Sequence, residues 1–513
     1  MTVRTLPCII RRKLEKYHKY CHRLQKKWQQ GTWLSLNQGQ RQMCLQRLHR
    51  YEAQLQKWGI ATTFSFALLT SGPSILQAQV SAPNGSEFLV NTYTTDSQEY
   101  VSVGVDDDGD FVIAWGSDGQ DGSDFGIYAQ RYNSSGTPQG SEFKVNTFTN
   151  NSQNVPSVGM DSDGDFVITW VSESQDGSDE GVYAQRYNSS GVPQGSEFLV
   201  NTYTTNDQVF SSIGMDSDGD FVIAWTSDGQ DGASRGIYAQ RYNSSGAPQG
   251  SEFKVNTYTS NNQTTPNVGM DSDGDFVIAW QSNGQDGYGY GVYAQRYNSS
   301  GTPQGSEFLV NTSTIGFQTH PKIGMDSDGD FVITWKGTDG DGDGVFMQRY
   351  NSSGVPQGSE VLVNTNTYED QNDPDIGMDS DGDFTITWES AYQEGGFDGS
   401  LDAIYAQHFD SSGTPQGSEF KVNTYTPLDQ RRPAIGMSSD GDFVIAWASQ
   451  GQDGSDVGVY AQRFGGSGSG TPSVPTLSEW GLLNLALLLM TFGTIYLINP
   501  DFSLRKAARR EEE

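Results

Sequence analysis

The sequence predicts an all-β fold, a seven-bladed β-propeller of four-stranded repeats about 55 residues long. The motif GSEF, or its variant GSEV, begins at residues 85, 140, 195, 250, 305, 358 and 417. Each repeat contains four short strand-like segments between Gly, Asn, Asp and Ser turns, without helical periodicity. The repeat region, 85–464, begins with the sequence of a fourth strand and ends with that of a third, so the N-terminal strand is expected to complete the last blade.

The strand pattern of the first repeat predicts how the blades pack. The expected strands are EFLVN (87–91), VSVGV (101–105), DFVIAW (110–115) and GIYAQRY (126–132). In DFVIAW, Phe111, Ile113 and Trp115 point to one face, whereas Val112 and Ala114 point to the other. Both faces are apolar, so this strand is expected to be covered on both sides by neighbouring sheets.

Two further segments predict the strand order within a blade. SVGM has small residues and a glycine, which suits a crowded innermost strand. The middle residue of EFLVN is Lys144, Lys254 or Lys421 in three repeats, and lysine is typical of a solvated edge strand. EFLVN is therefore expected to be outermost. A row of β-sandwich modules is the alternative architecture, but 55 residues are few for such a module.

The charge distribution separates the chain into parts. Residues 1–57 carry thirteen Lys or Arg and two Glu, a net charge of +11, whereas residues 58–499 carry 57 acidic and 14 basic residues, a net charge of −43. An acidic body of this kind repels phosphate, so nucleic acid is not an expected partner. Cys8, Cys21 and Cys44 all lie in the basic segment, which excludes disulfides and cysteine-zinc sites from the repeats.

The N-terminal region has the pattern of an export signal. Residues 1–58 are predicted to form a basic n-region of amphipathic helices, and residues 59–78 to form the apolar region and cleavage site, with cleavage after Ala78. This pattern implies the Sec export machinery as a partner. An uncleaved signal anchor is the alternative.

The C-terminal region has a sorting pattern. A Gly/Ser linker (465–473) precedes VPTLSEWG, an apolar run at 482–498 that is long enough for a transmembrane helix, and a basic tail. Residues 474–513 resemble the IPTL-CTERM protein-sorting domain, with Val474 in place of the family's isoleucine. The matching motif residues are Val474, Pro475, Thr476, Leu477, Trp480 and Gly481.

This resemblance implies a Gram-negative bacterium and an exosortase-type sorting enzyme as partner. It also implies anchoring in the inner membrane before processing, and then a cell-surface or extracellular location. An ordinary C-terminal anchor is the alternative. The body, in turn, is similar to F-x-VNT…DGDFV-x-W…QDG…G-x-YAQRY repeats of large secreted bacterial proteins, which implies an extracellular location without a defined activity.

Sequence variation is expected to lie on one rim of the propeller. The DSDGD turn after the first strand and the NSSGTPQG turn after the third are nearly identical in all repeats, whereas the two other connections vary. Because loops on a rigid scaffold carry function, the variable connections are the expected binding face, and neutral drift is the alternative. The candidate binding residues are Tyr100, Phe210, Arg235, Tyr288, Tyr290, Phe317, His320, Tyr392, Arg431 and Arg432.

A glutamine recurs before the first strand of every repeat. It either lines the end of the central channel or satisfies local backbone groups. The residues are Gln98, Gln153, Gln208, Gln263, Gln318, Gln371 and Gln430.

The acidic turn D-x-D-G-D allows two interpretations. Asp-Gly between two apolar strands is a hairpin signal, whereas three carboxylates on one turn offer oxygen ligands to Ca²⁺, the only cofactor considered. The later ligands of an EF-hand loop are missing, and Ser438 replaces the first aspartate in the last repeat. The candidate Ca²⁺ ligands are Asp106, Asp108, Asp110, Asp161, Asp163, Asp165, Asp216, Asp218, Asp220, Asp271, Asp273, Asp275, Asp326, Asp328, Asp330, Asp379, Asp381 and Asp383.

The function expected from these features is that of an exported, non-enzymatic surface protein. It would act in binding or adhesion, or as an extracellular matrix scaffold, with a surface glycan or another protein as partner. A propeller-based extracellular glycosidase or lyase is the alternative. No catalytic residue is assigned, since the repeats contain only two histidines, His320 and His408, in different units.

Overall fold

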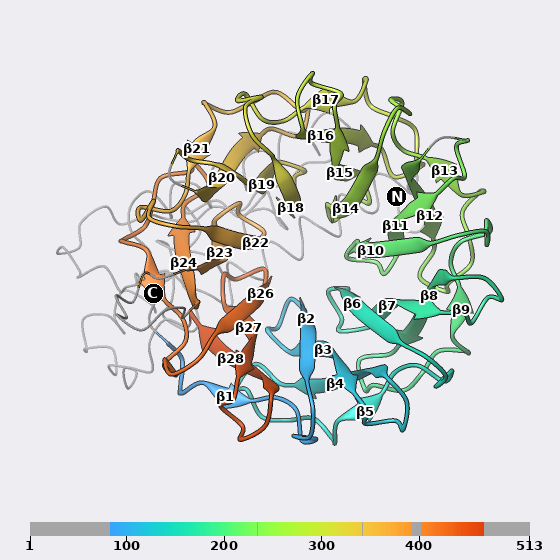
Figure 1. Cartoon of the computed structure of the whole chain (residues 1–513), viewed down its shortest axis with the longest axis vertical. Helices are drawn as coiled ribbons and strands as arrows, with labels where there is room; N and C mark the ends of the chain where they lie inside the picture. Colours follow the sequence, from blue (N-terminus) through green and yellow to red (C-terminus); the bar gives the residue numbers. More distant parts are fainter. Residues whose placement is uncertain (1–82, 233, 341, 392, 394–401, 466–513) are drawn as a thin grey trace, which may run out of the picture. The chain divides into compact units, whose positions relative to one another are not determined.

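The computed structural model describes residues 83–465, apart from 233, 341, 392 and 394–401. Seven four-stranded antiparallel sheets surround a common axis, as Figure 1 shows. This part of the chain is all-β, and a helix that could cross a membrane is absent from it. The predicted seven-bladed propeller is confirmed. The expected n-region, signal peptide, sorting motif and helix 482–498 lie outside the described residues.

The seven blades are numbered in chain order, so that blade 1 contains β2–β5 and blade 7 contains β26–β28 with β1. The inner strands are β2 (Gln98–Val105), β6 (Gln153–Met160), β10 (Gln208–Met215), β14 (Gln263–Met270), β18 (Thr319–Met325), β22 (Gln371–Met378) and β26 (Gln430–Met437). The second strands are β3 (Phe111–Asp118), β7 (Phe166–Glu173), β11 (Phe221–Asp228), β15 (Phe276–Asn283), β19 (Phe331–Thr338), β23 (Phe384–Ser390) and β27 (Phe443–Gln450).

The third strands are β4 (Phe125–Tyr132), β8 (Glu180–Tyr187), β12 (Arg235–Tyr242), β16 (Tyr290–Tyr297), β20 (Asp343–Tyr350), β24 (Ala403–Phe409) and β28 (Val457–Phe464). The outer strands are β5 (Phe143–Lys144), β9 (Phe198–Leu199), β13 (Phe253–Lys254), β17 (Phe308–Leu309), β21 (Val361–Leu362), β25 (Phe420–Lys421) and β1 (Phe88–Leu89).

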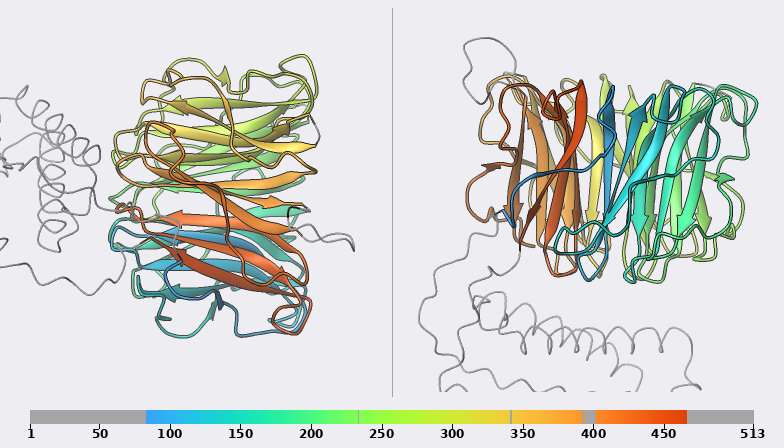
Figure 2. Two further views of the ribbon diagram at one scale, coloured as in Figure 1. Left: turned by 90° about the vertical axis from the view of Figure 1, so that its left-hand side faces the viewer. Right: turned by 90° about the horizontal axis from the view of Figure 1, so that it is seen from below.

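Blade 7 closes the ring by joining the two ends of the described chain. Its strand order is β1-β28-β27-β26, with Phe88 opposite Ala461 and Leu89 opposite Tyr460. The Val90 amide donates to the Val459 carbonyl at 2.8 Å. The predicted completion of the last blade by the N-terminal strand is therefore confirmed, and Figure 2 shows β1 beside the C-terminal strands.

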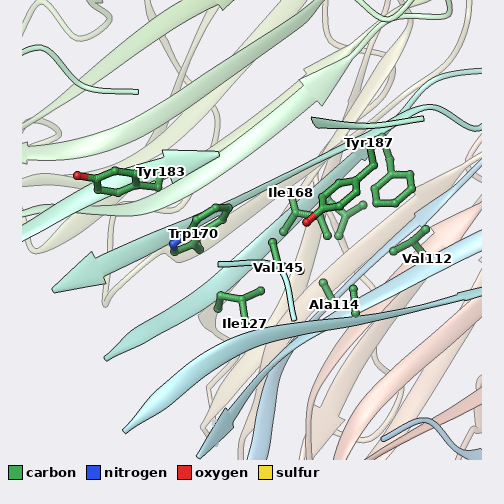
Figure 3. Packing of buried hydrophobic residues seen from close by; sticks show 11 residues of the cluster. Val112, Ala114, Ile127, Val145, Ile168, Trp170, Tyr183 and Tyr187 are labelled. Atoms are coloured by element: carbon green, nitrogen blue, oxygen red, sulfur yellow. The ribbon is translucent and has the colours of Figure 1, made fainter. Parts of the chain in front are cut away.

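Each blade packs a large apolar face on the small apolar face of the preceding blade. Between blades 1 and 2, Ile168 and Trp170 of β7 share one buried cluster with Val112, Ala114 and Ile127 (Figure 3). The same arrangement recurs between blades 7 and 1, so the seven interfaces form a closed series. Every second-strand tryptophan is at most 1% exposed, which explains why DFVIAW is apolar on both faces.

The inner strands lie so close together that their glycines are required. A Cβ on Gly214 of β10 would lie 2.8 Å from Cγ1 of Val268, which belongs to β14 of the next blade. Comparable short contacts would arise at the equivalent glycine of every blade, and each involves the following blade. The expected crowding of the SVGM strand is confirmed.

The constant rim consists of the turns between first and second strands and those between third and fourth strands. In six blades an arginine of the third strand reaches the NSSG turn of the next blade; the Arg186 guanidinium, for example, donates to the carbonyls of Ser244 at 2.6 Å and Ser245 at 2.7 Å. The six arginines are Arg131, Arg186, Arg241, Arg296, Arg349 and Arg463.

Blade 6 lacks this arginine. In blade 7 no turn connects the third strand to the fourth, so the carbonyl groups that would accept the hydrogen bonds of the arginine are missing. Blade 7 takes its outer strand from the N-terminal end of the repeat region, so no third-to-fourth-strand turn follows β28. His408 occupies the arginine position, is buried, and lies 2.9 Å from the Thr385 hydroxyl across the strand pair. One break in the repeat sequence thus follows from ring closure.

A second chain of hydrogen bonds links the DSDGD turns of neighbouring blades. The Ser162 hydroxyl donates to the Ser217 carbonyl at 2.9 Å, and the pattern continues through Ser217, Ser272, Ser327 and Ser380. Ser439 then donates to the Asp107 carbonyl of blade 1 at 3.4 Å. The near-identity of these turns therefore reflects contacts between blades as well as hairpin geometry.

Strand lengths differ from those expected. The outer strands pair over only two residues, as between β5 and β4. Beyond this pair, the side-chain oxygen of Asn146 accepts the Ile127 amide of β4, and Glu142 accepts the Thr92 amide of a crossover. The inner strands begin earlier than expected, at the recurring glutamine in six of the seven blades. Each inner strand also contains a β-bulge, which the strand pattern did not predict.

Overpacking of the inner ring tests this account of the fold. Gly214→Ala is expected to lower the free energy of unfolding by about 1–3 kcal/mol, because the added methyl group meets Val268. Chemical denaturation of the full chain measures the change. The double variant with Val268→Ala is expected to lose less than the sum of the two single variants. Strict additivity would show that these two residues are not in contact.

Candidate binding face on the variable rim

The variable rim consists of the loops between second and third strands and the crossovers that lead from each outer strand to the next inner strand. A glutamate beside each outer strand holds the crossover, and in six of the seven blades it also holds the loop between second and third strands. Glu142 accepts hydrogen bonds from the Thr92 amide and the Gln120 side chain, each at 2.6 Å. Glu87 repeats this arrangement across ring closure with Thr424 and Gln452. The recurring Glu, Thr and Gln residues thus hold the variable loops on a rigid base.

The recurring glutamines satisfy local backbone groups. Gln98 is fully buried, and its side-chain nitrogen donates to the Thr95 carbonyl at 2.8 Å while its oxygen accepts from Asn91 at 3.2 Å. All seven glutamines are at most 2% exposed. The local interpretation is confirmed, and the interpretation as residues lining a channel is wrong.

Each inner strand contains a β-bulge two residues after the glutamine. The pairing register shifts between Glu99 and Ser102 in blade 1 and at the equivalent place in every other blade. In each blade the residue after the first of these two has a positive φ, between 46° and 57°. These seven residues, here called the bulge ring, are Tyr100, Val155, Phe210, Thr265, His320, Asp373 and Arg432.

The bulge ring combines backbone strain with side-chain diversity. The left-handed region is costly for any non-glycine residue, and most of all for β-branched residues such as Val155 and Thr265. Its seven members are of seven different residue types, and none of them is buried. Bulges are typical of places where a strand re-aims a side chain towards a functional site.

In three of the seven blades, a side chain of the preceding blade accepts the amide of the strained bulge residue. The amide of Thr265 donates to the Thr226 hydroxyl at 3.1 Å, and that of His320 donates to the Gln281 side chain at 3.0 Å. The amide of Arg432 donates to Glu389 at 3.2 Å. The accepting position follows the tryptophan of the second strand, and it varies with the bulge residue that it supports.

The structure brings four of the predicted binding residues into the bulge ring: Tyr100, Phe210, His320 and Arg432. Arg235 and Tyr290 begin third strands, Tyr288 and Phe317 lie in variable loops, and Arg431 immediately precedes Arg432. Tyr392 lies outside the described residues.

Sequence reasoning missed Val155, Thr265, Asp373 and the supporting Glu389. One signal was present. A proline follows the bulge residue in five blades, and proline inside a strand pattern indicates a bulge or an edge.

Charged groups gather where blades 6, 7 and 1 meet. The Arg432 guanidinium pairs with Glu99 and lies 4.3 Å from the centre of the Tyr100 ring. Arg431 pairs with Asp402 at 3.2 Å and with Asp429. These contacts join blade 7 to both of its neighbours, because Asp402 belongs to the blade 6 loop and Glu99 to blade 1.

Glu389 is the buried carboxyl group of this cluster. It is 8% exposed. Burial, together with the nearby charges of Asp373 and Asp402, raises its pKa to about 8, although the hydrogen bond from the Arg432 amide lowers it. Burial also raises the pKa of Asp402, whereas its hydrogen bond with Arg431 lowers it. Glu389 is therefore expected to hold a proton at neutral pH.

The acidic turns on the constant rim use their carboxylates as turn ligands. Oδ1 of Asp161 accepts the amides of Asp163 and Asp165, both at 2.9 Å, and Asp165 accepts the Ser189 amide at 2.8 Å. The remaining oxygen of Asp161 lies against Gly219 in the next blade, whose φ is +83° and where a Cβ would be 3.0 Å away. The hairpin interpretation thus has a hydrogen-bonded basis.

Burial raises the pKa of the first aspartate of these turns. The pKa of Asp106, Asp161 and Asp216 rises to about 6, and that of Asp271 to about 7. Within the described ranges, no group of three or more His, Cys, Asp or Glu residues has an arrangement that would hold a metal ion. Calcium binding at the turns stays a prediction.

The chain carries an IPTL-CTERM motif at residues 472–494, which confirms the resemblance expected from its C-terminal sequence. The motif indicates an exported cell-surface protein of a Gram-negative bacterium, processed by an exosortase-type sorting system. No curated protein matches the chain.

Among solved structures, the chain is similar to a protein of unknown function from Dyadobacter fermentans, with 9% identity and a TM-score of 0.46 over 74% of this chain and 98% of the other. It is similar to the polysaccharide lyase Uly1, with 12% identity and a TM-score of 0.47 over 73% and 90% of the two chains. It is also similar to the β-propeller domain of the Trilobed protease from Pyrococcus furiosus, with 8% identity and a TM-score of 0.43 over 75% and 100%.

The raised pKa values predict how stability depends on pH. A carboxyl group whose pKa is higher in the folded than in the unfolded chain adds stability at low pH, which is lost as the pH rises through the folded value. For the first aspartates this loss falls between about pH 4 and pH 7. The thermal midpoint of the full chain is therefore expected to be higher at about pH 5 than at about pH 8.

Asp271→Asn is the matched variant, because asparagine can accept the same two amides without titrating. It is expected to reduce the difference between the two midpoints. An unchanged difference in this variant would contradict the assignment of the raised pKa to Asp271.

Proposed function

We propose that this exported cell-surface protein is a non-enzymatic binding protein whose ligand face is the variable rim. The proposed ligand is a surface glycan, a matrix polymer or another protein. Binding of this kind would serve adhesion or hold together an extracellular matrix. Anchoring in the inner membrane before the sorting step is part of the same proposal.

One observation carries the proposal: the chain keeps side chains where glycine would relieve strain. All seven DSDGD turns place glycine at their positive-φ position, from Gly109 to Gly441. The bulge ring places glycine at none. Neutral drift would be expected to reach glycine at some of these positions, since glycine adopts this conformation without steric cost. The retained and divergent side chains favour selection for contact with a ligand.

The contrast between the two rims supports the same interpretation. On the constant rim, the repeated Arg, Ser and Asp side chains bond to neighbouring turns, which explains their invariance. On the variable rim, the invariant Glu, Gln and Asn residues support the loops, while the exposed positions differ between blades. The rigid base and variable surface are typical of a recognition face.

Exposed members of the bulge ring test this proposal. Phe210→Ser and His320→Ser are expected to lower binding to envelope fragments and extracellular polymer prepared from a Gram-negative culture, with little change in thermal midpoint. A fluorescently labelled full chain and a sedimentation assay measure the binding. Val192→Ser and Val355→Ser, at exposed constant-rim positions, are the controls. Equal binding by all four variants and the unaltered chain would contradict the proposal.

A second candidate function, a glycosidase or lyase, is favoured by Glu389 alone. A carboxyl group that holds its proton at neutral pH can act as a general acid, and Arg432 and Asp402 are its neighbours. Its burial and its contact with the Arg432 backbone equally fit a structural role.

Turnover of a polysaccharide panel distinguishes the two functions. The binding proposal expects no release of reducing or unsaturated ends by the full chain. If release occurs and Glu389 is its general acid, Glu389→Gln lowers the rate by about 100-fold or more while preserving the acceptor for the Arg432 amide. Release that is unaffected by this variant would exclude Glu389 from the chemistry.

A further inference from the structure

Apart from Phe210 of blade 3, the large apolar side chains exposed on the described variable rim lie on one part of it. Ile315, Phe317, Tyr368 and Leu428 lie in the crossovers that lead into blades 5, 6 and 7, and Tyr288 lies in the adjacent loop of blade 4. Their exposed fractions are 79% for Ile315, 61% for Tyr288, 59% for Tyr368, 56% for Phe317 and 41% for Leu428. These five residues are here called the aromatic arc.

The arc breaks the sevenfold repeat. The crossovers into blades 1–4 place Thr95, Asn150, Thr205 and Ser260 at the position that Ile315 and Tyr368 occupy in blades 5 and 6. At the position of Phe317 they place Ser97, Ser152, Asp207 and Asn262. A turn at this place therefore does not need an apolar residue. The hydrophobic substitutions occur in the crossovers into the consecutive blades 5, 6 and 7 and in the adjacent loop of blade 4, which places them along one part of the rim.

The arc is held by its surroundings. The Phe317 ring contacts that of Tyr290 at 6.3 Å between centroids, and the Gln318 amide donates to the Tyr290 carbonyl at 2.8 Å. The Tyr368 amide donates to the Asn366 side chain at 3.2 Å, and that of Tyr288 donates to Asp286 at 3.1 Å. Aromatic rings on an ordered backbone lose little conformational freedom when a ligand binds.

Two residues with carboxylate acceptors follow one of these rings in the chain. Glu369 and Asp370 are exposed and directly follow Tyr368. Apolar ring faces beside carboxylate acceptors match a pyranose, whose C–H face stacks on an aromatic ring while its hydroxyl groups donate to oxygen.

The net charge of the acidic body narrows the class of glycan that can bind. Residues 58–499 carry a net charge of −43, which repels uronic-acid polymers, sulfated glycans and anionic lipid surfaces. Resting on the proposed function, we infer that the aromatic arc binds a neutral polysaccharide by stacking of sugar rings on Tyr288, Phe317 and Tyr368. Ile315 and Leu428 extend the apolar surface between and beyond these rings.

Affinity electrophoresis of the full chain tests this inference. The gels contain one neutral polymer each, xyloglucan, mixed-linkage β-glucan, galactomannan or dextran, or the anionic polymer alginate. At least one neutral polymer is expected to retard the chain, and alginate is not. Tyr288→Ala, Phe317→Ala and Tyr368→Ala are each expected to weaken the retardation about threefold to tenfold, and Phe317→Tyr is expected to preserve it.

The controls separate this inference from the proposed function. Val192→Ala and Val355→Ala remove side chains that are each 53% exposed on the constant rim, and they are expected to leave retardation unchanged. If a neutral polymer binds but only bulge-ring variants weaken it, the inference about the arc fails and the proposed function stands.

Three other results would overturn the inference. The first is retardation by alginate alone, and the second is no retardation by any polymer. The third is self-association of the chain that the arc variants lose, which would identify a second copy of the chain as the partner. If bulge-ring variants also leave binding to envelope fragments unchanged, the proposed function fails as well.

Discussion

The packing of one blade on the next is the interaction on which the rest of this structure depends. Phe, Ile and Trp of each second strand pack on the small Val, Ala or Thr face of the preceding blade, and the inner glycines allow the sheets to approach. Because each blade is large on one face and small on the other, no blade can bury both faces by itself. The series must close, and pairing of β1 with β28 closes it through a blade built from both ends of the repeat region.

Hydrogen bonds at the constant rim also make each blade depend on the next one. The arginines and serines reach only to the next blade, so each motif copy completes its neighbour. His408 is the exception that agrees with this explanation. It replaces the arginine in blade 6, whose neighbour, blade 7, has no turn that could accept the hydrogen bonds of an arginine. Invariance on this rim is therefore explained by structure and requires no ligand.

The variable rim is free to differ because the rest of the ring is rigid. A strained bulge persists only when its surroundings hold it, and in three blades a side chain of the preceding blade accepts the bulge amide. The rim is not uniform: charged groups gather at blades 6, 7 and 1, whereas apolar side chains are exposed from blade 4 to blade 7. The same scaffold thus carries charged and apolar groups on different parts of one rim, in a protein that the sorting tail directs to the cell surface.

The amino-acid sequence by itself determined the repeat length, the strand order, the completion of the last blade by the N-terminal strand and the sorting tail. These features depend on the alternation of apolar and polar residues, on turn residues and on the spacing of the repeats, all of which can be identified in the sequence itself. It also separated the constant from the variable connections, because antiparallel strands place alternate turns at the same end of a sheet.

Only the tertiary structure decided which residues share a surface. Arg432 and Glu99 are 333 positions apart, and they meet because the ring closes. Nothing in the sequence around Glu389 distinguishes it from other residues of the second strands. Its pKa is raised because the residue is buried against the next blade. The bulge ring was hidden because a single extra residue reverses the alternation of side chains without a glycine to mark it. The sequence displays neighbours along a strand, whereas neighbours between blades exist only once the sheets have packed.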